Sequence, residues 1–354
     1  MSSATKVITL HSPSKDVKIG GGNPIVVQTM LNKMPADTDG NVSQALSCVE
    51  AGCEVIRFSV PNQQALKTLT SLIENVPIPV VADIHFDYEM AIASAEAGAA
   101  KIRINPGNIG GFKKTSEVVK CCKRQGCAIR IGVNAGSLDK EISYRNDISF
   151  EEKLCLSAKN YCDFLSDECD FDNFVVSIKA HDVTSTVKAN EQFSKLMPAV
   201  PLHIGITEAG SAFQGLIKSG TGLGILLNES IGDTIRISLT DDPEVEVRAA
   251  WQLLSALNLR RRGVEIISCP TCARTQVDLI NIVKKVEDML SKETKPIKVA
   301  IMGCVVNGPG EAADADVGVA CGKGSAVLFK DGKIIKKVNE DEIVNSLKEQ
   351  IDLL

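Results

Sequence analysis

The sequence predicts an α/β protein in which a TIM-type (β/α)8 barrel is followed by a smaller α+β domain. Eight short β-branched runs alternate with longer helical patterns between residue 24 and about residue 240. That stretch has the ~250 residues typical of a closed parallel barrel, whereas an open doubly wound sheet usually ends at about five or six strands. The 354-residue chain also exceeds the ~250 to 300 residues at which one core stops growing. We therefore expect domains at residues 1–261 and 262–354.

The eight runs are the expected barrel strands, in chain order. They comprise residues 25–29, 54–60, 79–84, 101–105, 128–134, 174–180, 201–207 and 234–239. Several helical patterns between them end at a glycine, as expected for a left-handed C-cap: Gly52, Gly98 and Gly220. Two short runs before the first strand, residues 6–11 and 16–19, predict a hairpin that plugs the bottom of the barrel.

The eighth strand is followed by a final helix and then by the second domain. Asp242 and Pro243 form a helix start, and apolar residues then recur at helical spacing as far as Leu257. After a short basic joint, residues 264–354 mix strands with helices. The expected elements are strands at 264–267, 298–302 and 317–319, a hairpin about Asp331-Gly332, and helices at 277–290 and 340–351.

Charge and composition limit the classes of function. The chain carries 39 Lys and Arg against 44 Asp and Glu, a net charge of −5, and 4% aromatic residues. It therefore lacks the basic footprint and the stacking platforms of a nucleic-acid-binding protein. No apolar stretch approaches the ~20 residues of a membrane span, and the first residues lack the apolar core of a signal peptide. We expect a cytoplasmic protein whose 12 cysteines are thiols or metal ligands rather than disulfides.

Positive charges interrupt five of the predicted strands. They are Arg57, Arg103, Arg130, Lys179 and Arg236. Side chains two residues apart share one face of a strand, so Arg236 lies with Ser238, and Asn134 lies on the face of Arg130. If that face is the barrel interior, these groups line one pocket at the carboxyl ends of the strands, where active sites of this fold lie. Five converging cations favour a polyanion, and a diphosphate accepts bidentate hydrogen bonds from them.

A second interpretation of these cations stays open at this point. Each cation taken alone could equally pair with a core carboxylate or lie on a solvated face. Further polar side chains fall at the ends of the same strands: Asp83, His85, Asp182 and Glu208.

Three cysteines share one end of the second domain. Cys269 and Cys272 form a Cys-x-x-Cys pair after one predicted strand, and Cys304 follows another. Such a pair can hold zinc, an iron-sulfur cluster or a redox disulfide, and the third cysteine disfavours the disulfide. The fourth ligand could be Cys321, which would complete a closed structural site, or Glu311, a hard and replaceable ligand. Spacing alone leaves both open.

Motifs along nearly the whole chain resemble those of one family. They are VQTM, GCEVIRFSVP, ADIHFDY, KIRINPGNIG, RIGVNAGSL, PLHIGITEAG, GDTIRISLT, SCPTCARTQVDL and MGCVVNGPGEAADADVG. In combination they resemble the 4-hydroxy-3-methylbut-2-en-1-yl diphosphate synthases, the IspG/GcpE family, in the bacterial two-domain form. One departure is His181, where the family commonly has serine.

The resemblance implies an oxidoreductase of the non-mevalonate (MEP) isoprenoid pathway. Its barrel would bind 2-C-methyl-D-erythritol 2,4-cyclodiphosphate, and a 4Fe-4S cluster in its second domain would open the ring reductively, with loss of water. The product would be 4-hydroxy-3-methylbut-2-enyl diphosphate, and flavodoxin or ferredoxin would donate the electrons. The resemblance also implies a homodimer in which the cluster domain caps the partner's barrel. A joint of ~5 residues, which spans at most ~17 Å, favours the same arrangement.

The resemblance also assigns residues. It implies cluster ligands at Cys269, Cys272, Cys304 and Glu311. It implies substrate ligands at Arg57, Arg103, Arg130, Asn134, Lys179, Arg236, Ser238 and Asn307. Glu208 is implied as the proton donor. We predict a catalytic role for Glu311 as well, because four thiolates would leave the cluster no exchangeable position.

Two other functions fit parts of the sequence. A phosphate-binding TIM-barrel lyase or transferase of the pteroate-synthase kind, with a structural zinc tail, would be colourless and hold zinc. A ferredoxin-like electron carrier or metal-dependent interaction module would not need a five-cation pocket in the attached barrel.

Overall fold

The computed structural model describes residues 5–134, 136, 138, 140–207, 210–291, 293–304 and 315–354. The chain divides into two compact units, Met1–Arg260 and Arg261–Leu354. Among the described residues, none of the helices combines the length and the apolar character that crossing a bilayer requires.

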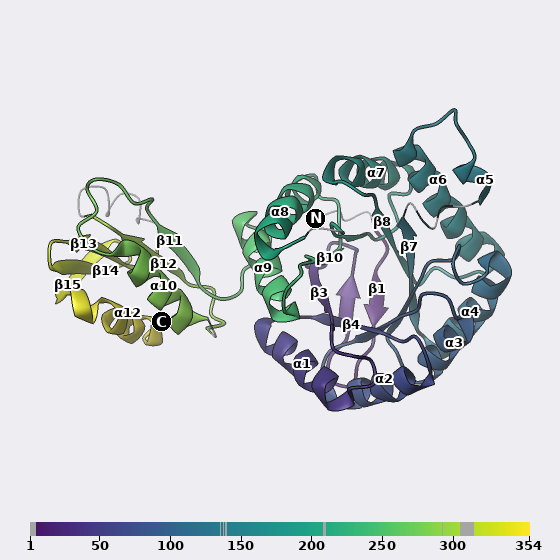
Figure 1. The fold of residues 1–354 in the computed structure, drawn as a ribbon, viewed down its shortest axis with the longest axis horizontal. Helices are drawn as coiled ribbons and strands as arrows, with labels where there is room; N and C mark the ends of the chain where they lie inside the picture. The colour runs from purple at the N-terminus through teal and green to yellow at the C-terminus, as the bar shows by residue number, and fades with distance from the viewer. Residues whose placement is uncertain are drawn as a thin grey trace. The chain divides into compact units, whose positions relative to one another are not determined.

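The first unit is a closed barrel of eight parallel strands (Figure 1). The strands are β3 (Val26–Met30), β4 (Val55–Ser59), β5 (Val80–Asp83), β6 (Lys101–Ile104), β7 (Ala128–Asn134), β8 (Phe174–Lys179), β9 (His203–Ile204) and β10 (Thr234–Ile235). Sheet pairing runs from β8 through β3 to β10 and β9, and a parallel bridge between Val176 and Leu202 closes the circle. The eight predicted strands are confirmed, and the last two are shorter than predicted.

The early ends of β9 and β10 have a local cause. Gly205 follows β9, and a Cβ placed on it would lie 2.7 Å from the carbonyl oxygen of Arg236. The two backbones therefore approach more closely at this point than side chains would allow.

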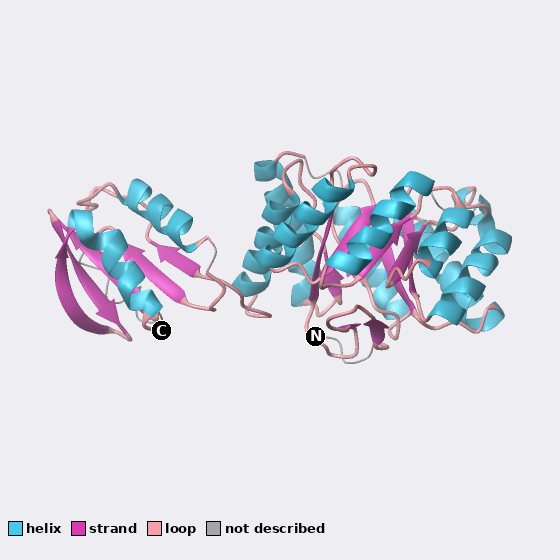
Figure 2. Cartoon of the chain, turned by 90° about the horizontal axis from the view of Figure 1, so that it is seen from below, coloured by secondary structure: helices cyan, strands magenta, loops and turns pink. Residues whose placement is uncertain are grey.

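Helices surround the barrel, as Figure 2 shows. They are α1 (Thr38–Ala51), α2 (Gln63–Asn75), α3 (Tyr88–Glu96), α4 (Gly111–Gln125), α5 (Lys140–Ser143), α6 (Phe150–Asp163), the π-helical η2 (Phe164–Glu168), α7 (Val183–Leu196), α8 (Ala212–Asn228) and α9 (Pro243–Ala256). The predicted Pro243 start of α9 is confirmed, with Asp242 at the N-cap position. The main core fills the space between strands and helices and includes Val27, Ile56 and Ile129.

A hairpin plugs the amino end of the barrel, as predicted. Its strands are β1 (Ile8–Leu10) and β2 (Val17–Ile19), which pair antiparallel. Ile8, Leu10 and Ile19 pack against residues at the starts of the barrel strands, among them Val81 and Ala128. Because apolar side chains fill this end, polar groups further along the strands face the carboxyl end.

The second unit is a five-stranded mixed sheet with helices. It comprises β11 (Glu265–Ser268), α10 (Leu279–Leu290), β12 (Lys298–Met302), β13 (Val317–Gly322), β14 (Ser325–Lys330), β15 (Lys333–Asn339), η3 (Glu340–Glu342) and α12 (Ile343–Asp352). The strands pair in sequence order; β11, β12 and β13 are parallel, and the rest are antiparallel. The predicted hairpin turn is confirmed, since Asp331 and Gly332 have φ of 49° and 72°.

Candidate active site

Strand register places the predicted cations inside the barrel. Arg57, Val81 and Lys101 are paired across three neighbouring strands, and Val81 packs on the plug. Residues paired in register point to the same side of a parallel sheet, so this row faces inward. Asp83, Arg103 and Arg130 form the next inward row, nearer the carboxyl ends of the strands.

Two of the arginines share one buried carboxylate. The Nη1 of Arg103 donates to Asp83 Oδ1 at 3.2 Å, and the Nε of Arg57 lies 3.7 Å from Asp83 Oδ2. His85 Nε2 is 3.4 Å from the same oxygen. Burial opposes the charge on Asp83, but the nearby arginines outweigh it and lower the pKa of Asp83 to about 2. Burial also lowers the pKa of Arg57, to about 10, although Asp83 opposes this shift.

A second carboxylate holds Arg236. The side chain of Glu246, on α9, accepts from Arg236 Nε at 3.0 Å and from Nη2 at 3.1 Å. It also accepts from Thr29 Oγ1 at 2.6 Å and from the Leu239 backbone N–H at 3.0 Å. Glu246 thereby holds both the guanidinium and the chain just beyond Ser238.

Other cations of the interior have no such partner among the described residues. Arg130 is 1% exposed, and its Nε and Nη1 atoms make no hydrogen bond there. Lys101 is fully buried, and its Nζ is likewise unpartnered. Burial and the neighbouring arginines hold the pKa of Arg130 well below its usual range. Buried donors without acceptors indicate a place for an anion or bound water.

His203, at the start of β9, faces the same interior. Its Nδ1 lies 3.3 Å from Thr234 Oγ1, and its Nε2 has no partner among the described residues. Burial, together with Arg130 and Lys179, lowers its pKa well below the usual value, so this histidine is neutral.

The remaining predicted substrate ligands lie at the carboxyl ends of the strands. Lys179 is half-buried at the end of β8, and a Cβ on Gly205 would lie 3.3 Å from its Nζ. Burial and then Arg130 hold the pKa of Lys179 well below its usual value. Ser238 is half-buried, and Asn134 accepts from the Gly136 backbone N–H at 3.1 Å. Three predicted site residues, Glu208, Asn307 and Glu311, lie outside the described residues.

The cysteine loops of the second unit meet at one edge of its sheet. Cys269 follows β11 directly, and Cys304 follows the parallel neighbour β12 after one residue. The Gly303 backbone N–H donates to Cys269 Sγ at 3.3 Å, and the Gln276 N–H donates to the Gly303 carbonyl at 3.1 Å. Hydrogen bonds at Arg274 lower the pKa of the exposed Cys272 thiol.

The three cysteines of these loops are suited to a soft metal group, and a fourth ligand would have to come from another residue. Among the described residues, no three His, Cys, Asp or Glu side chains are yet arranged to hold a metal, and Glu311 lies outside that set. Thiolates on adjoining loops are the donors that iron-sulfur clusters use. Cys321 is fully buried in the core, and burial raises its pKa to about 11, which disfavours it as the fourth ligand.

Sequence reasoning missed Lys101 and Glu246. Lys101 could have been found from its spacing, because it precedes Arg103 by two residues on the same strand. Glu246 carries no such signal, since it lies on a helix otherwise defined by its apolar spacing. The open alternative, pairing with core carboxylates, holds for Arg57, Arg103 and Arg236 but not for Arg130 among the described residues.

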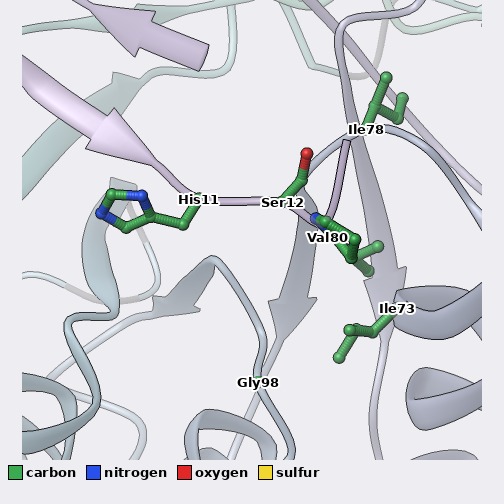
Figure 3. Close-up of a pocket in the computed structure, with 7 residues that line it drawn as sticks. His11, Ser12, Ile73, Ile78, Val80 and Gly98 are labelled. Carbon is green, nitrogen blue, oxygen red and sulfur yellow. The ribbon is translucent and has the colours of Figure 1, made fainter. Parts of the chain in front are cut away.

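A pocket of about 230 Å³ lies at the other end of the barrel (Figure 3). It is lined by His11, Ser12, Pro13, Ile73, Ile78, Val80 and Gly98. Its one titratable side chain, His11, pairs with Asp16 at 3.0 Å. This mostly apolar pocket does not share the chemistry of the cationic interior.

Fold and site together define a (β/α)8-barrel protein with a cationic interior suited to an anion and a second unit that carries paired cysteine loops. The chain belongs to the GcpE family: the GcpE TIM-barrel domain matches residues 10–251, and the GcpE protein C-terminal domain matches residues 265–353.

Two relatives illustrate the likeness. The 4-hydroxy-3-methylbut-2-en-1-yl diphosphate synthase (flavodoxin) of Aquifex aeolicus is 50% identical over 336 residues, covering 95% of this chain and 94% of the relative. The protein of the same name from Sulfurihydrogenibium sp. is 49% identical over 336 residues, covering 95% of each chain.

Solved structures support the barrel fold alone. Dihydropteroate synthase from Thermus thermophilus has a TM-score of 0.54 and 12% identity, and it covers 72% of this chain and 98% of its own. At such low identity the likeness concerns the fold and does not favour the predicted lyase or transferase alternative.

Proposed function

We propose that this chain is a 4-hydroxy-3-methylbut-2-en-1-yl diphosphate synthase that reductively opens the ring of 2-C-methyl-D-erythritol 2,4-cyclodiphosphate. Its relatives carry that name over nearly the whole chain. The observation that carries the proposal is the barrel interior, where buried cations without carboxylate partners among the described residues favour a bound anion. The reaction belongs to non-mevalonate isoprenoid synthesis.

The substrate's phosphates bind at the carboxyl ends of the barrel strands. Arg57, Arg103 and Arg236 enter this site already oriented by carboxylates, and Arg130 supplies charge that the described residues leave uncompensated. Lys179 adds a further donor at the end of β8. Ser238, Asn134 and Asn307 complete the predicted set. Fixed donors around both phosphates keep the reacting C–O bonds still while electrons are delivered.

The reaction adds two electrons and one proton to the cyclodiphosphate dianion. The bond between the ring carbon and the phosphate oxygen breaks, a hydroxyl group leaves as water, and a carbon–carbon double bond forms. Glu208, which follows β9 in the sequence, is the proposed proton donor. The unpaired cations stabilise the extra negative charge of the open diphosphate.

Cys269, Cys272, Cys304 and Glu311 are the proposed ligands of a 4Fe-4S cluster. When bound, this group supplies the two electrons one at a time. Glu311 is the ligand expected to exchange, because a carboxylate binds iron of such a cluster less firmly than a thiolate does. The relatives are named as flavodoxin-dependent synthases, which supports flavodoxin as the electron donor, and we expect the protein to work beside that donor in the cytoplasm.

The path of the chain supports a homodimer with the active site shared between copies. Arg260 pairs with Glu54 at the amino end of the barrel, with Nη1 to Oε2 at 2.6 Å, and its Cζ stacks over Trp251 at 4.5 Å. Gly263 already bonds to Thr294 of the second unit. The residues between span only ~10 Å, and a joint this short favours capping of a partner's barrel, as the family resemblance also implies.

Exposed apolar side chains at the mouth support the same arrangement. Met34, Phe86, Tyr144 and Phe213 are 75%, 75%, 84% and 76% exposed. They follow the carboxyl ends of β3, β5, β7 and β9. Exposed apolar side chains in the segments after these strands are suited to burial against the second unit of another copy.

The first experiment measures iron, acid-labile sulfide and zinc per chain on anaerobically purified protein. We expect about four iron and four sulfide, and turnover of the cyclodiphosphate with reduced flavodoxin. Cys304→Ser should lose iron, whereas Cys321→Ala, the matched control, should keep it. About one zinc without sulfide after reconstitution would overturn the proposal in favour of a structural tail.

Complementation tests the shared site. Arg130→Met, assayed at a cyclodiphosphate concentration far below its KM, and Cys304→Ser are each expected to be almost inactive, and mixing them should restore activity because a mixed dimer contains one intact site. No restoration under conditions of subunit exchange would exclude the arrangement in trans.

A further inference from the structure

Lys101 lies deeper in the barrel than any of the predicted substrate ligands on its strand. It opens β6, two residues before Arg103, and pairs in register with Val81 and Ala128. Both neighbours pack against the plug hairpin, so Lys101 stands between an apolar floor and the arginine layer. Its side chain is fully buried, and its Nζ has no partner among the described residues.

The groups that face Lys101 are mostly cationic. Arg130 on β7 and Arg57 on β4 repel the positive charge of Lys101. Lys101 in turn helps to lower the pKa of His203 on β9. Cys127, which precedes β7, is the one nearby group that favours the charge. The plug contributes Ile8, Leu10 and Ile19, which are apolar. Asp83, the nearest carboxylate of the upper row, already serves Arg57 and Arg103.

The charge balance of the interior indicates which side chain changes its protonation state. The described interior holds four arginines, Arg57, Arg103, Arg130 and Arg236, beside two carboxylates, Asp83 and Glu246. Two positive charges therefore remain before either lysine is counted. Arginine cannot release its proton at ordinary pH, whereas a buried lysine does so readily. An anion bound among the arginines would favour the protonated form of the lysine again.

We propose that Lys101 is a further substrate-binding group of this barrel, which gains a proton when a cyclic diphosphate binds in the arginine layer above it. The inference rests on the proposed function, because it requires a diphosphate in that layer. In the free protein, burial and the neighbouring arginines favour loss of the Lys101 proton, and a bound anion replaces the missing countercharge.

The direction of the pH effect follows from the burial of Lys101. Burial, and then Arg130 and Arg57, lower the pKa of Lys101 to about 7 in the free protein. A bound anion raises that pKa, so affinity is greatest at low pH and falls as pH rises through about 7. Each phosphorus of a cyclic diphosphate carries one hydroxyl, which is strongly acidic, so the ligand contributes no proton of its own near neutral pH.

Calorimetric titration of the holoprotein with the cyclodiphosphate tests this, without reductant so that no turnover occurs. Heats measured at pH 7 in buffers of different ionisation enthalpy give the number of protons taken up. We expect Lys101→Met to take up about half a proton less than the unchanged protein, since a group with a pKa near 7 is half protonated there. Lys120→Met, at a 66% exposed lysine of α4, is the matched control and should take up as much as the unchanged protein.

Affinity across pH gives the second readout. Lys101→Met should bind about tenfold more weakly at pH 6 for each unit by which binding raises the lysine's pKa, and equally once the pH exceeds the lysine's pKa in the complex. Equal proton uptake by both proteins, or a loss of affinity that is independent of pH, would overturn the proposal. Absence of any cyclodiphosphate binding by the unchanged holoprotein would instead contradict the proposed function. Unfolding followed by Trp251 fluorescence establishes that the variant is folded.

Discussion

Two groups of cations share the barrel interior, and they differ in whether a carboxylate lies beside them. Arg57, Arg103 and Arg236 belong to the first group, held by Asp83 or Glu246 at 3.0 to 3.7 Å. Arg130 and Lys101 belong to the second, with buried nitrogens that lack partners among the described residues. The two groups also differ in burial, since the side chains of the first group are 11 to 15% exposed, whereas Arg130 is 1% exposed and Lys101 is fully buried.

The first group of cations provides fixed orientation, and the second group provides uncompensated positive charge. A carboxylate between two guanidinium groups fixes their geometry before any ligand arrives, but it also neutralises part of the field that would attract an anion. Cations without a carboxylate keep that field and make the empty interior less stable. A site that combines both groups therefore has fixed donors and a net positive charge, and the two groups should respond to mutation with opposite signs.

The largest effect is expected for Asp83→Asn. It leaves Arg57 and Arg103 without their shared countercharge, and breaking a buried pair costs about 3 to 5 kcal/mol. Urea unfolding followed by the fluorescence of Trp251, the single tryptophan, which lies in the barrel, measures the loss. Glu287→Gln, at an exposed site on α10, is the control. An unchanged unfolding midpoint would show that Asp83 does not hold the arginines.

The opposite sign is expected for Arg130→Met. Removing a buried cation with unpartnered nitrogens should stabilise the protein without ligand by about 1 to 3 kcal/mol. The same change should weaken cyclodiphosphate binding roughly 10- to 100-fold, through loss of charged hydrogen bonds. Unfolding and calorimetric titration measure the two quantities on one preparation. If Arg130→Met destabilises the free protein as Asp83→Asn does, the distinction between the two groups is wrong.

Lys101→Met should show a smaller effect with a pH dependence of its own. The pKa of Lys101 is about 7 in the folded protein and 10.5 in the unfolded chain. Between pH 7 and pH 10.5, Lys101 is therefore protonated in the unfolded chain but has released its proton in the folded protein. The free energy of unfolding of the unchanged protein therefore increases as pH rises through this interval, and the variant lacks that increase. The difference in unfolding free energy should change by about 1 kcal/mol between pH 7 and pH 8. A constant difference across that interval would mean that Lys101 does not titrate there.

Strand periodicity predicted that the cations of the barrel strands share a face with other polar side chains and left open whether that face is the barrel interior. In a barrel with an apolar floor, side chains two residues apart must point the same way, and this placed Arg103, Arg130 and Arg236 in one interior. The residue pattern also indicated eight strands and the plug, because each is a local run of β-branched residues bounded by turn signals.

Partners could not be predicted in the same way. Asp83 meets Arg103 through the register between β5 and β6, which local sequence does not specify. Glu246 reaches Arg236 from a helix, and nothing in the apolar spacing of α9 identifies it. The roles of Glu208, Asn307 and Glu311 remain predictions from family resemblance, since these residues lie outside the described part of the chain.

The smallest effect is expected at His181, where the family commonly has serine. Its ring stacks on Phe150 with centroids 6.2 Å apart and planes at 10°, and the side chain is exposed. This contact lies just beyond the end of β8, and an exposed ring pair contributes at most about 1 kcal/mol. His181→Ser should therefore leave the KM for the cyclodiphosphate within about twofold and lower stability slightly, as steady-state assays and unfolding would show. A tenfold rise in KM would instead place His181 among the substrate-binding groups and extend the cationic interior to the rim.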